Sequence, residues 1–163
     1  MKMRQVIRSE YTGLLFRLVL GYVFIYASIG KISNPLDFSI AIQNYRILPD
    51  SLSNIMAIIL PWLELYCGLF LVLGILPRGS SIIIASLTTV FIIAIISAMV
   101  RGLDISCGCT NPADTSDKLD FFKVVEDIFY LAISLYCYFF PPERLTVTKL
   151  IHLIKPEKLE PEI

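Results

Sequence analysis

The chain has 163 residues, of which 56% are hydrophobic and 17% charged, and its mean hydropathy is +0.72. A soluble domain of this length has too much surface to be so apolar, so the composition indicates an integral membrane protein. The net charge is zero, and nothing in this balance suggests nucleic acid as a partner.

Four apolar segments, each of about 20 residues or more, predict membrane-spanning helices, because a spanning helix needs ~20 apolar residues. They cover residues 11–32, 52–76, 79–100 and 121–140. Together they predict a single all-α transmembrane domain, an integral membrane four-helix bundle. Pro77, Arg78 and Gly79 are expected to form the turn between the second and third helices. Only the third segment is free of charge, so the others must shelter polar groups inside the bundle.

Two shorter stretches predict amphipathic helices at the membrane surface. The first begins at Asn34 and continues to about Tyr45, with Pro35 placed as the first helical residue. The second covers residues 144–155, where apolar side chains alternate with polar ones. It belongs to a tail, residues 141–163, that we predict to be cytoplasmic and amphipathic.

The distribution of basic residues predicts the orientation in the membrane. Those on the side of the chain termini are Lys2, Arg4, Arg8, Arg78, Arg144, Lys149, Lys155 and Lys158, and those on the other side are Lys31, Arg46, Arg101 and Lys118. The excess favours both termini in the cytoplasm of a bacterium, with the protein in the inner membrane. The connection between the third and fourth helices then faces the periplasm or the cell exterior, an oxidising compartment.

That connection carries Cys107-Gly108-Cys109. A disulfide between these cysteines requires a bend in the chain, which Gly108 permits. So small a ring is expected to be strained, and strained, exposed disulfides exchange readily. We therefore predict a redox-active pair, with a structural disulfide as the alternative; two thiols without a nearby histidine make a poor metal site. Cys67 and Cys137 lie in apolar segments and are expected to pack as small hydrophobes.

Glu64 is the residue whose placement in a membrane has the highest free-energy cost, because it lies near the middle of the second apolar segment. A charge at the bilayer centre costs at least ~2.5 kcal/mol. The carboxyl group must therefore be protonated or paired with a cation, and the candidates on the first helix are Arg17 and Lys31. Such a pair would either fix the register of two helices or serve a function.

A second set of charged residues is expected beneath the cysteine pair. Glu126 and Asp127 lie in the fourth helix, and Lys123 is spaced to pair with either of them. Arg101 ends the third helix shortly before the cysteines. A nearby cation lowers the pKa of a thiol, and a carboxylate can move the proton that disulfide exchange requires.

Taken in order, several motifs resemble the MauE-like (methylamine utilisation) branch of the DoxX-like membrane proteins. They are Arg17 to Gly21, Gly30-Lys31, Asn34-Pro35, Tyr45-Arg46 with Pro49, Pro61-Trp62-Leu63-Glu64-Leu65 with Gly68, Arg101-Gly102, Cys107-Gly108-Cys109 and Glu126-Asp127. The family pattern usually continues the cysteine pair with Phe-Gly, where this chain has Thr110-Asn111-Pro112. The resemblance implies a four-helix membrane protein associated with redox processing of extracytoplasmic proteins, with a thioredoxin-like partner. It also implies a link to maturation of the disulfide-rich subunit of methylamine dehydrogenase, and the DoxX-like relatives are associated with quinone-linked oxidation.

We therefore predict a thiol-disulfide exchange protein, in which Cys107 and Cys109 are the catalytic pair and a periplasmic thioredoxin-like domain is the partner. Glu64, Arg17, Asp127, Arg101 and Lys31 are expected to form a polar interior that supports the cycle. A quinone is a candidate electron acceptor, on account of two aromatic residues near Glu64, Trp62 and Tyr66.

Two alternatives belong to other classes of function. One is a non-catalytic assembly factor or subunit of an oxidoreductase complex, in which the cysteines form a static disulfide. The other is a small transporter built around Glu64, since acidic residues inside membranes often mark transport paths.

Overall fold

The computed structural model describes residues 10–103 and 121–140, and these residues contain five helices and no strand. The helices are α2 (Glu10–Ser33), α3 (Pro35–Asn44), α4 (Asp50–Leu73), α5 (Pro77–Val100) and α6 (Phe121–Phe139). This confirms the prediction of an all-helical chain. Cys107, Cys109 and the tail at residues 141–163 lie outside the described residues.

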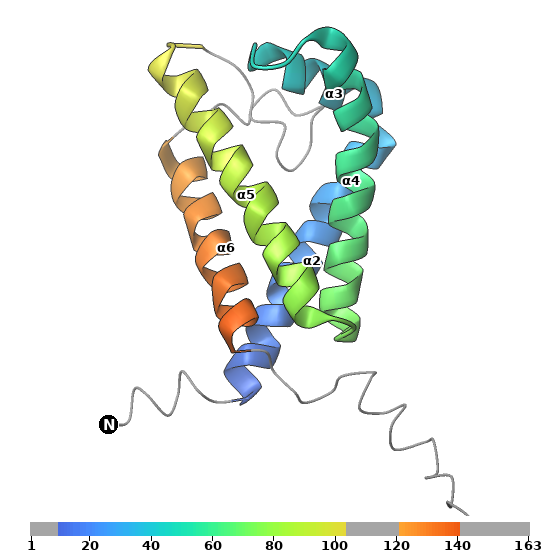
Figure 1. Ribbon diagram of the computed structural model, residues 1–163, viewed down its shortest axis with the longest axis vertical. Helices are drawn as coiled ribbons and strands as arrows, with labels where there is room; N and C mark the ends of the chain where they lie inside the picture. The colour runs from blue at the N-terminus through green and yellow to red at the C-terminus, as the bar shows by residue number, and fades with distance from the viewer. Residues whose placement is uncertain (1–9, 104–120, 141–163) are drawn as a thin grey trace, which may run out of the picture.

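The four long helices run alternately up and down along the bundle (Figure 1). Helix α3 lies across one end, which we call the α3 end. There α2 and α5 finish and α4 and α6 begin, so the connection from Leu103 to Phe121 leaves and enters the bundle at this end. Helix α2 begins and α6 ends at the opposite end.

Three of the described helices are long and apolar enough to cross a membrane: Tyr11–Ser33 of α2, α4 and α5. A 24-residue helix such as α4 or α5 extends about 36 Å, more than the ~30 Å hydrocarbon core. Large apolar side chains cover the outward surfaces, as expected where the surroundings are lipid rather than water; examples are Leu15, Ile58 and Ile93. The chain is therefore a helical membrane protein.

Helix α6 completes the four-helix bundle by packing along α5 and, less closely, along α2. It has 19 residues, and its first turns carry Lys123, Glu126 and Asp127. That α6 also crosses the membrane stays a prediction.

The turn between α4 and α5 comes earlier than the sequence suggested. Helix α4 ends at Leu73, because Gly74 adopts a left-handed conformation (φ 71°) and closes the helix with hydrogen bonds to the preceding carbonyls. Pro77 is the first residue of α5, a position that suits its fixed φ and missing N–H. The expectation that Pro77, Arg78 and Gly79 form the turn was therefore wrong; they form the first turn of α5.

Helix α3 begins at Pro35, as predicted, and buries Phe38, Ser39 and Ala41. It packs on the first part of α4, where the Ser39 hydroxyl donates a hydrogen bond of 2.5 Å to Oδ1 of Asn54. This contact holds α3 across the end of the bundle.

Helices α2 and α4 make the closest contact in the described part of the chain, and two glycines permit it. A Cβ atom added at Gly68 would lie 3.0 Å from the carbonyl oxygen of Gly21, and one added at Gly21 would lie 2.9 Å from that of Gly68. The two backbones therefore nearly touch, as small residues allow in membrane helix pairs. This crossing sets which residues of α2 face which residues of α4.

A hydrophobic core lies in the half of the bundle away from the α3 end and includes both cysteines of the described residues. It consists of Leu20, Cys67, Leu71, Ile84, Ile133 and Cys137. Both thiols are buried and free, which agrees with the expectation that they serve as packing residues.

Candidate functional site

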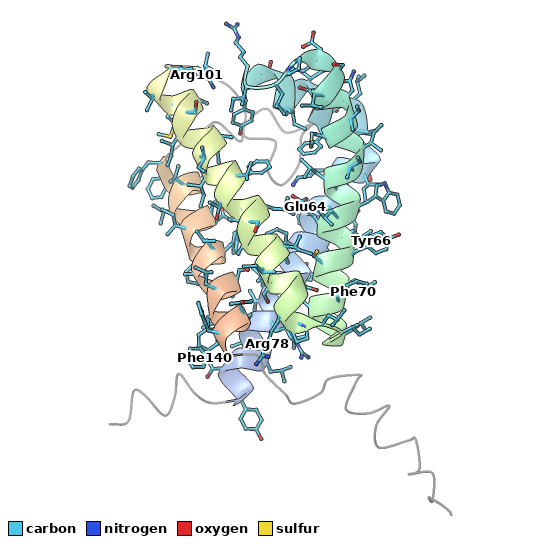
Figure 2. The ribbon with its side chains drawn as sticks, in the orientation of Figure 1. Glu64, Tyr66, Phe70, Arg78, Arg101 and Phe140 are labelled. Atoms are coloured by element: carbon cyan, nitrogen blue, oxygen red, sulfur yellow. The ribbon has the colours of Figure 1, made fainter. Side chains whose placement is uncertain are left out.

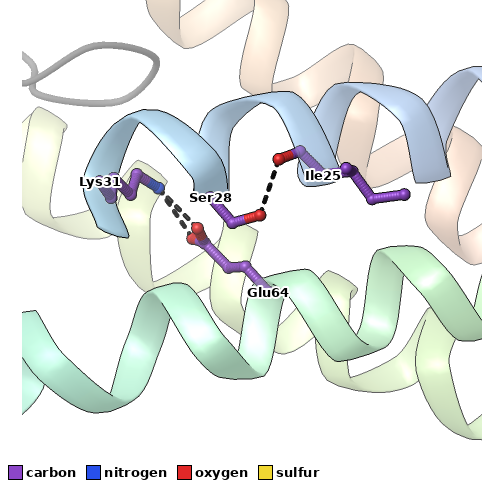
Figure 3. Close-up of polar contacts among 4 residues, drawn as sticks. All are labelled: Ile25, Ser28, Lys31 and Glu64. Carbon is purple, nitrogen blue, oxygen red and sulfur yellow. Dashed lines mark hydrogen bonds and ion pairs between the residues drawn. The ribbon is translucent and has the colours of Figure 1, made fainter. Parts of the chain in front are cut away.

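The most prominent polar feature of the interior is an ion pair between Lys31 of α2 and Glu64 of α4 (Figure 3). The Lys31 ammonium donates to both carboxylate oxygens, at 2.7 and 2.9 Å, and only 3% of Lys31 and 4% of Glu64 are exposed. Figure 2 shows Glu64 directed inward from α4 among the helices. The pair neutralises the carboxylate inside the bundle and ties the two helices together.

Of the two candidate partners for Glu64, the structure selects Lys31 and not Arg17. The two cations lie fourteen positions apart on the same helix, about 21 Å at ~1.5 Å per residue. The α2–α4 crossing brings the end of α2 that carries Lys31 opposite Glu64, whereas the buried Arg17 lies nearer the opposite end. Within the predicted polar interior, Glu64 therefore meets Lys31, and Arg17 lies apart from that pair.

Two aromatic rings complete the surroundings of the Lys31 ammonium. Its nitrogen lies 5.2 Å from the ring centre of Phe38 and 5.4 Å from that of Phe91, distances typical of cation–π contacts. Ser28, drawn in the same close-up, donates instead to the carbonyl of Ile25. A carboxylate and two rings thus share one ammonium group.

Helix α6 contributes a second group of charges. Lys123 pairs with Glu126 at 3.2 Å, one of its two predicted partners, and the hydroxyl of Tyr130 donates to the other oxygen of Glu126 at 2.8 Å. Asp127 is oriented differently: its Oδ2 atom is buried and has no hydrogen-bond partner among the residues that the structure describes. Asp127 is therefore the carboxylate of this group whose interactions are incomplete.

Arg101 follows the last residue of α5 and lies at the α3 end of the bundle, where Figure 2 labels it. Its guanidinium donates to the carbonyl oxygen of Tyr45 at 2.6 Å and to that of Arg46 at 3.4 Å, and its Nε donates to the carbonyl of Ser97 at 3.0 Å. Arg101 therefore fastens the end of α5 to the segment after α3. Arg101 lies two residues before Leu103, which is the last described residue before the connection that carries the cysteines.

Tyr45 connects the same segment to α6. Its ring belongs to a buried cluster with Ile95, Ala98 and Val124. Burial raises the pKa of the Tyr45 phenol above its ordinary value, and the nearby charge of Asp127 raises this pKa further. The phenol is therefore neutral at pH 7.

A cavity of about 240 Å³ joins the two charged groups. It lies between α2, α5 and α6, and Glu64 reaches it from α4; its lining residues are Tyr22, Val23, Phe24, Tyr26, Ala27, Lys31, Glu64, Leu87, Thr88, Phe91, Lys123, Glu126, Asp127 and Tyr130. The ion pair, the charges of α6 and several aromatic rings therefore surround one space.

Two aromatic residues singled out in the sequence do not take part in this site. Trp62 and Tyr66 are about half exposed, contact each other with ring centres 6.3 Å apart, and do not line the cavity. Figure 2 shows Tyr66 pointing outward from α4, with Phe70 one turn further along. They cover a surface of α4 rather than a binding site near Glu64.

Among the lining residues that the sequence did not single out are Thr88, Phe91 and Tyr130. Thr88 and Phe91 belong to α5, which reads as a uniformly apolar segment, so nothing indicates which of its faces meets a polar space. Tyr130 follows Glu126 by four residues, and that spacing was the one available signal, since such pairs meet on a helix.

The known proteins that this chain resembles belong to one family. The family model described as "Methylamine utilisation protein MauE" matches residues 9–140. The chain is 28% identical over 135 residues to the methylamine utilization protein MauE of Methylophilus methylotrophus, which covers 82% of this chain and 71% of that protein. It is 32% identical over 94 residues to the MauE of Paracoccus denitrificans, covering 57% of this chain and 50% of that protein.

No solved structure matches the chain. These matches do not test whether the chain also belongs to the wider DoxX-like group, so that membership stays a prediction. Because the family match extends over most of the chain and over all the described helices, this protein belongs to the MauE family of methylamine utilisation proteins.

Proposed function

We propose that this protein is a membrane thiol-disulfide redox protein of the methylamine utilisation system. Its Cys107 and Cys109 would exchange electrons with a periplasmic thioredoxin-like protein. The observation that carries the proposal is the Cys107-Gly108-Cys109 motif, on the connection that leaves the bundle at Leu103 and re-enters it at Phe121. Membership of the MauE family supports the link to methylamine utilisation.

The atoms and electrons of this thiol-disulfide exchange balance between the two proteins, with no other reactant. In one direction, a thiolate of the Cys107–Cys109 pair attacks the partner's disulfide and forms a mixed disulfide between the proteins. The second thiol of the pair then displaces the partner's sulfur, so that this pair becomes a disulfide and the partner a dithiol. Two electrons and two protons pass to the partner, and the reverse sequence returns them.

The described charged groups support this proposal by what they hold in place. The Lys31–Glu64 pair joins α2 to α4, and Arg101 fastens the end of α5 to the segment after α3. We propose that these contacts keep the α3 end rigid, so that the cysteine connection starts and ends at fixed points.

The orientation is part of the proposal, because exchange with a periplasmic partner requires the cysteines outside the cytoplasm. The excess of basic residues on the side of the termini supports an inner-membrane protein with both termini in the cytoplasm. After a membrane-impermeant reductant has opened the disulfide, a membrane-impermeant maleimide added to intact cells should then label Cys107 and Cys109. Labelling that occurs only after the cells are opened would contradict the orientation.

Trapping of the partner tests the redox role directly. Cys109→Ser should leave Cys107 in a mixed disulfide with the partner, visible as a higher-mass species that reductant removes. Cys67→Ser is the matched control, since that thiol is buried in the core and should trap nothing. If the Cys107–Cys109 disulfide stays closed across a series of redox buffers at glutathione-like potentials, the exchange proposal fails and a static structural disulfide takes its place.

A further inference from the structure

The cavity between α2, α5 and α6 contains more negative than positive groups. Three carboxylates line it, Glu64, Glu126 and Asp127, against two ammonium groups, Lys31 and Lys123. Lys31 is engaged by Glu64, and Lys123 pairs with Glu126. Among the residues that the structure describes, Asp127 is the cavity carboxylate for which no ion pair is found. Ionised groups inside a membrane are normally paired, so this arrangement calls for one more cation.

A second, independent observation points into the same cavity. Thr88 is 5% exposed and its Oγ1 has no hydrogen-bond partner among the residues that the structure describes. A threonine within a helix usually bonds the carbonyl four residues earlier. Its neighbour Thr89 does so, donating to Ala85 at 2.7 Å. Thr88 does not make this bond, and it is one of the residues that line the cavity.

From these groups we infer that the cavity binds a small organic ammonium ion. An ammonium group brings hydrogen-bond donors and a positive charge, which suit the carboxylate of Asp127 and the hydroxyl of Thr88, two side chains of the cavity lining that lack hydrogen-bond partners for a buried oxygen within the described residues. Tyr22, Tyr26 and Tyr130 present aromatic rings to the same space, and such rings attract cations.

The protein holds its own ammonium group in the same way. Lys31 is bound by the carboxylate of Glu64 and by the rings of Phe38 and Phe91. The remainder of the cavity offers the same kinds of group, a carboxylate and aromatic rings, with no side-chain ammonium bound to Asp127 in the described part of the chain. The ligand would place an ammonium group beside the carboxylate of Asp127, as Lys31 places one beside the carboxylate of Glu64.

Size and ligand type favour an organic cation over a metal ion. The cavity of about 240 Å³ is far larger than a bare ion and somewhat below the ~300–1,000 Å³ of sites for drug-sized ligands. No group of three or more metal-binding side chains occurs within residues 10–103 and 121–140. Tyr22 and Tyr26, which line the cavity, are more than half exposed on α2.

The test uses the full chain in a nonionic detergent, with n-butylammonium as the probe and isothermal titration calorimetry as the measurement. We expect saturable binding of n-butylammonium, much weaker binding of n-butanol, which has the same alkyl chain without the charge, and none of potassium ion. Asp127→Asn should weaken n-butylammonium binding by about tenfold to a hundredfold, as expected when a charged hydrogen bond is lost. Thr88→Val should weaken it by about twofold to tenfold.

The control for Thr88→Val is Thr89→Val, one position along α5 and outside the cavity lining, which should bind as the unaltered protein does. Equal binding of n-butanol and n-butylammonium, or equal losses in the two threonine variants, would overturn the inference. If Asp127→Asn does not fold, these two comparisons decide it. The double variant Cys107→Ser/Cys109→Ser should bind normally, because this site is independent of the thiol pair; failure of the exchange proposal would therefore leave it intact.

Discussion

Helix α2 meets its neighbours in two different ways. Against α4 it places Gly21 and Gly68 so close together that a single added carbon would press on a backbone oxygen. Against α6 it leaves a cavity of about 240 Å³, lined by large aromatic and charged side chains. Small residues let two membrane helices approach until their backbones touch, whereas large polar ones keep helices apart and leave space that a ligand can enter.

The difference assigns separate tasks to the two contacts. The α2–α4 contact sets the register of the bundle and ends in the Lys31–Glu64 pair. The α2–α6 contact contributes less packing and contains the incompletely bonded Asp127. Substitutions on the α4 side should therefore affect stability, and those on the α6 side should affect binding.

The largest effect is expected from breaking the buried pair on the α4 side. Lys31→Met should lower the free energy of unfolding by about 3–5 kcal/mol, because it leaves Glu64 charged and without a cation in a nonpolar interior. Thermal or chemical unfolding in detergent measures this. The double variant Lys31→Met/Glu64→Met should regain most of the loss, since apolar residues of similar volume can replace a buried pair. A double variant no more stable than Lys31→Met would contradict this account.

The next effect concerns the glycine contact itself. Gly68→Ala should cost about 1–3 kcal/mol, because the new methyl group meets the backbone of α2 and forces the helices apart. Gly79→Ala is the matched control: its Cβ would meet nothing closer than 3.9 Å, so the change should be neutral or slightly stabilising. The same unfolding measurement compares the two. Equal losses would show that the α2–α4 contact is not tight at Gly68.

A bulkier change on the cavity side should be tolerated better. Ala27→Leu adds three carbons where α2 faces the cavity, and it should change the free energy of unfolding by about 1 kcal/mol or less, because the side chain enters existing space. It should at the same time abolish n-butylammonium binding. A loss of stability greater than that of Gly68→Ala would remove the contrast between the two faces of α2.

The smallest effect is expected at the exposed pair of α6. Glu126→Gln removes the charge that pairs with Lys123 but keeps an oxygen that can accept from Tyr130. Because Glu126 is exposed, the expected change is about 0.5 kcal/mol or less. Comparison with Lys31→Met in the same unfolding assay then separates a buried pair from an exposed one. A loss above about 2 kcal/mol would place Glu126 in the buried network.

The sequence by itself determined the helices, because a run of some 20 apolar residues specifies a membrane helix without reference to the rest of the chain. It also required that Glu64 be neutralised, since the cost of an isolated charge in a membrane depends only on its surroundings. Pro35 at the start of α3 was readable for the same local reason. The α4–α5 turn was misjudged because Pro77 was taken as a turn residue rather than as the first helical one.

Only the tertiary structure decided which residues meet. Arg17 and Lys31 are equivalent as cations on one helix, and the choice between them depends on where α2 crosses α4, at Gly21 and Gly68. The cavity likewise exists only because α2 and α6 are separated beside α5. Its α5 wall includes Thr88, a residue with no distinguishing neighbours in the sequence. Helix formation depends on local composition, whereas partners and cavities depend on the relative position of helices that are distant in the chain.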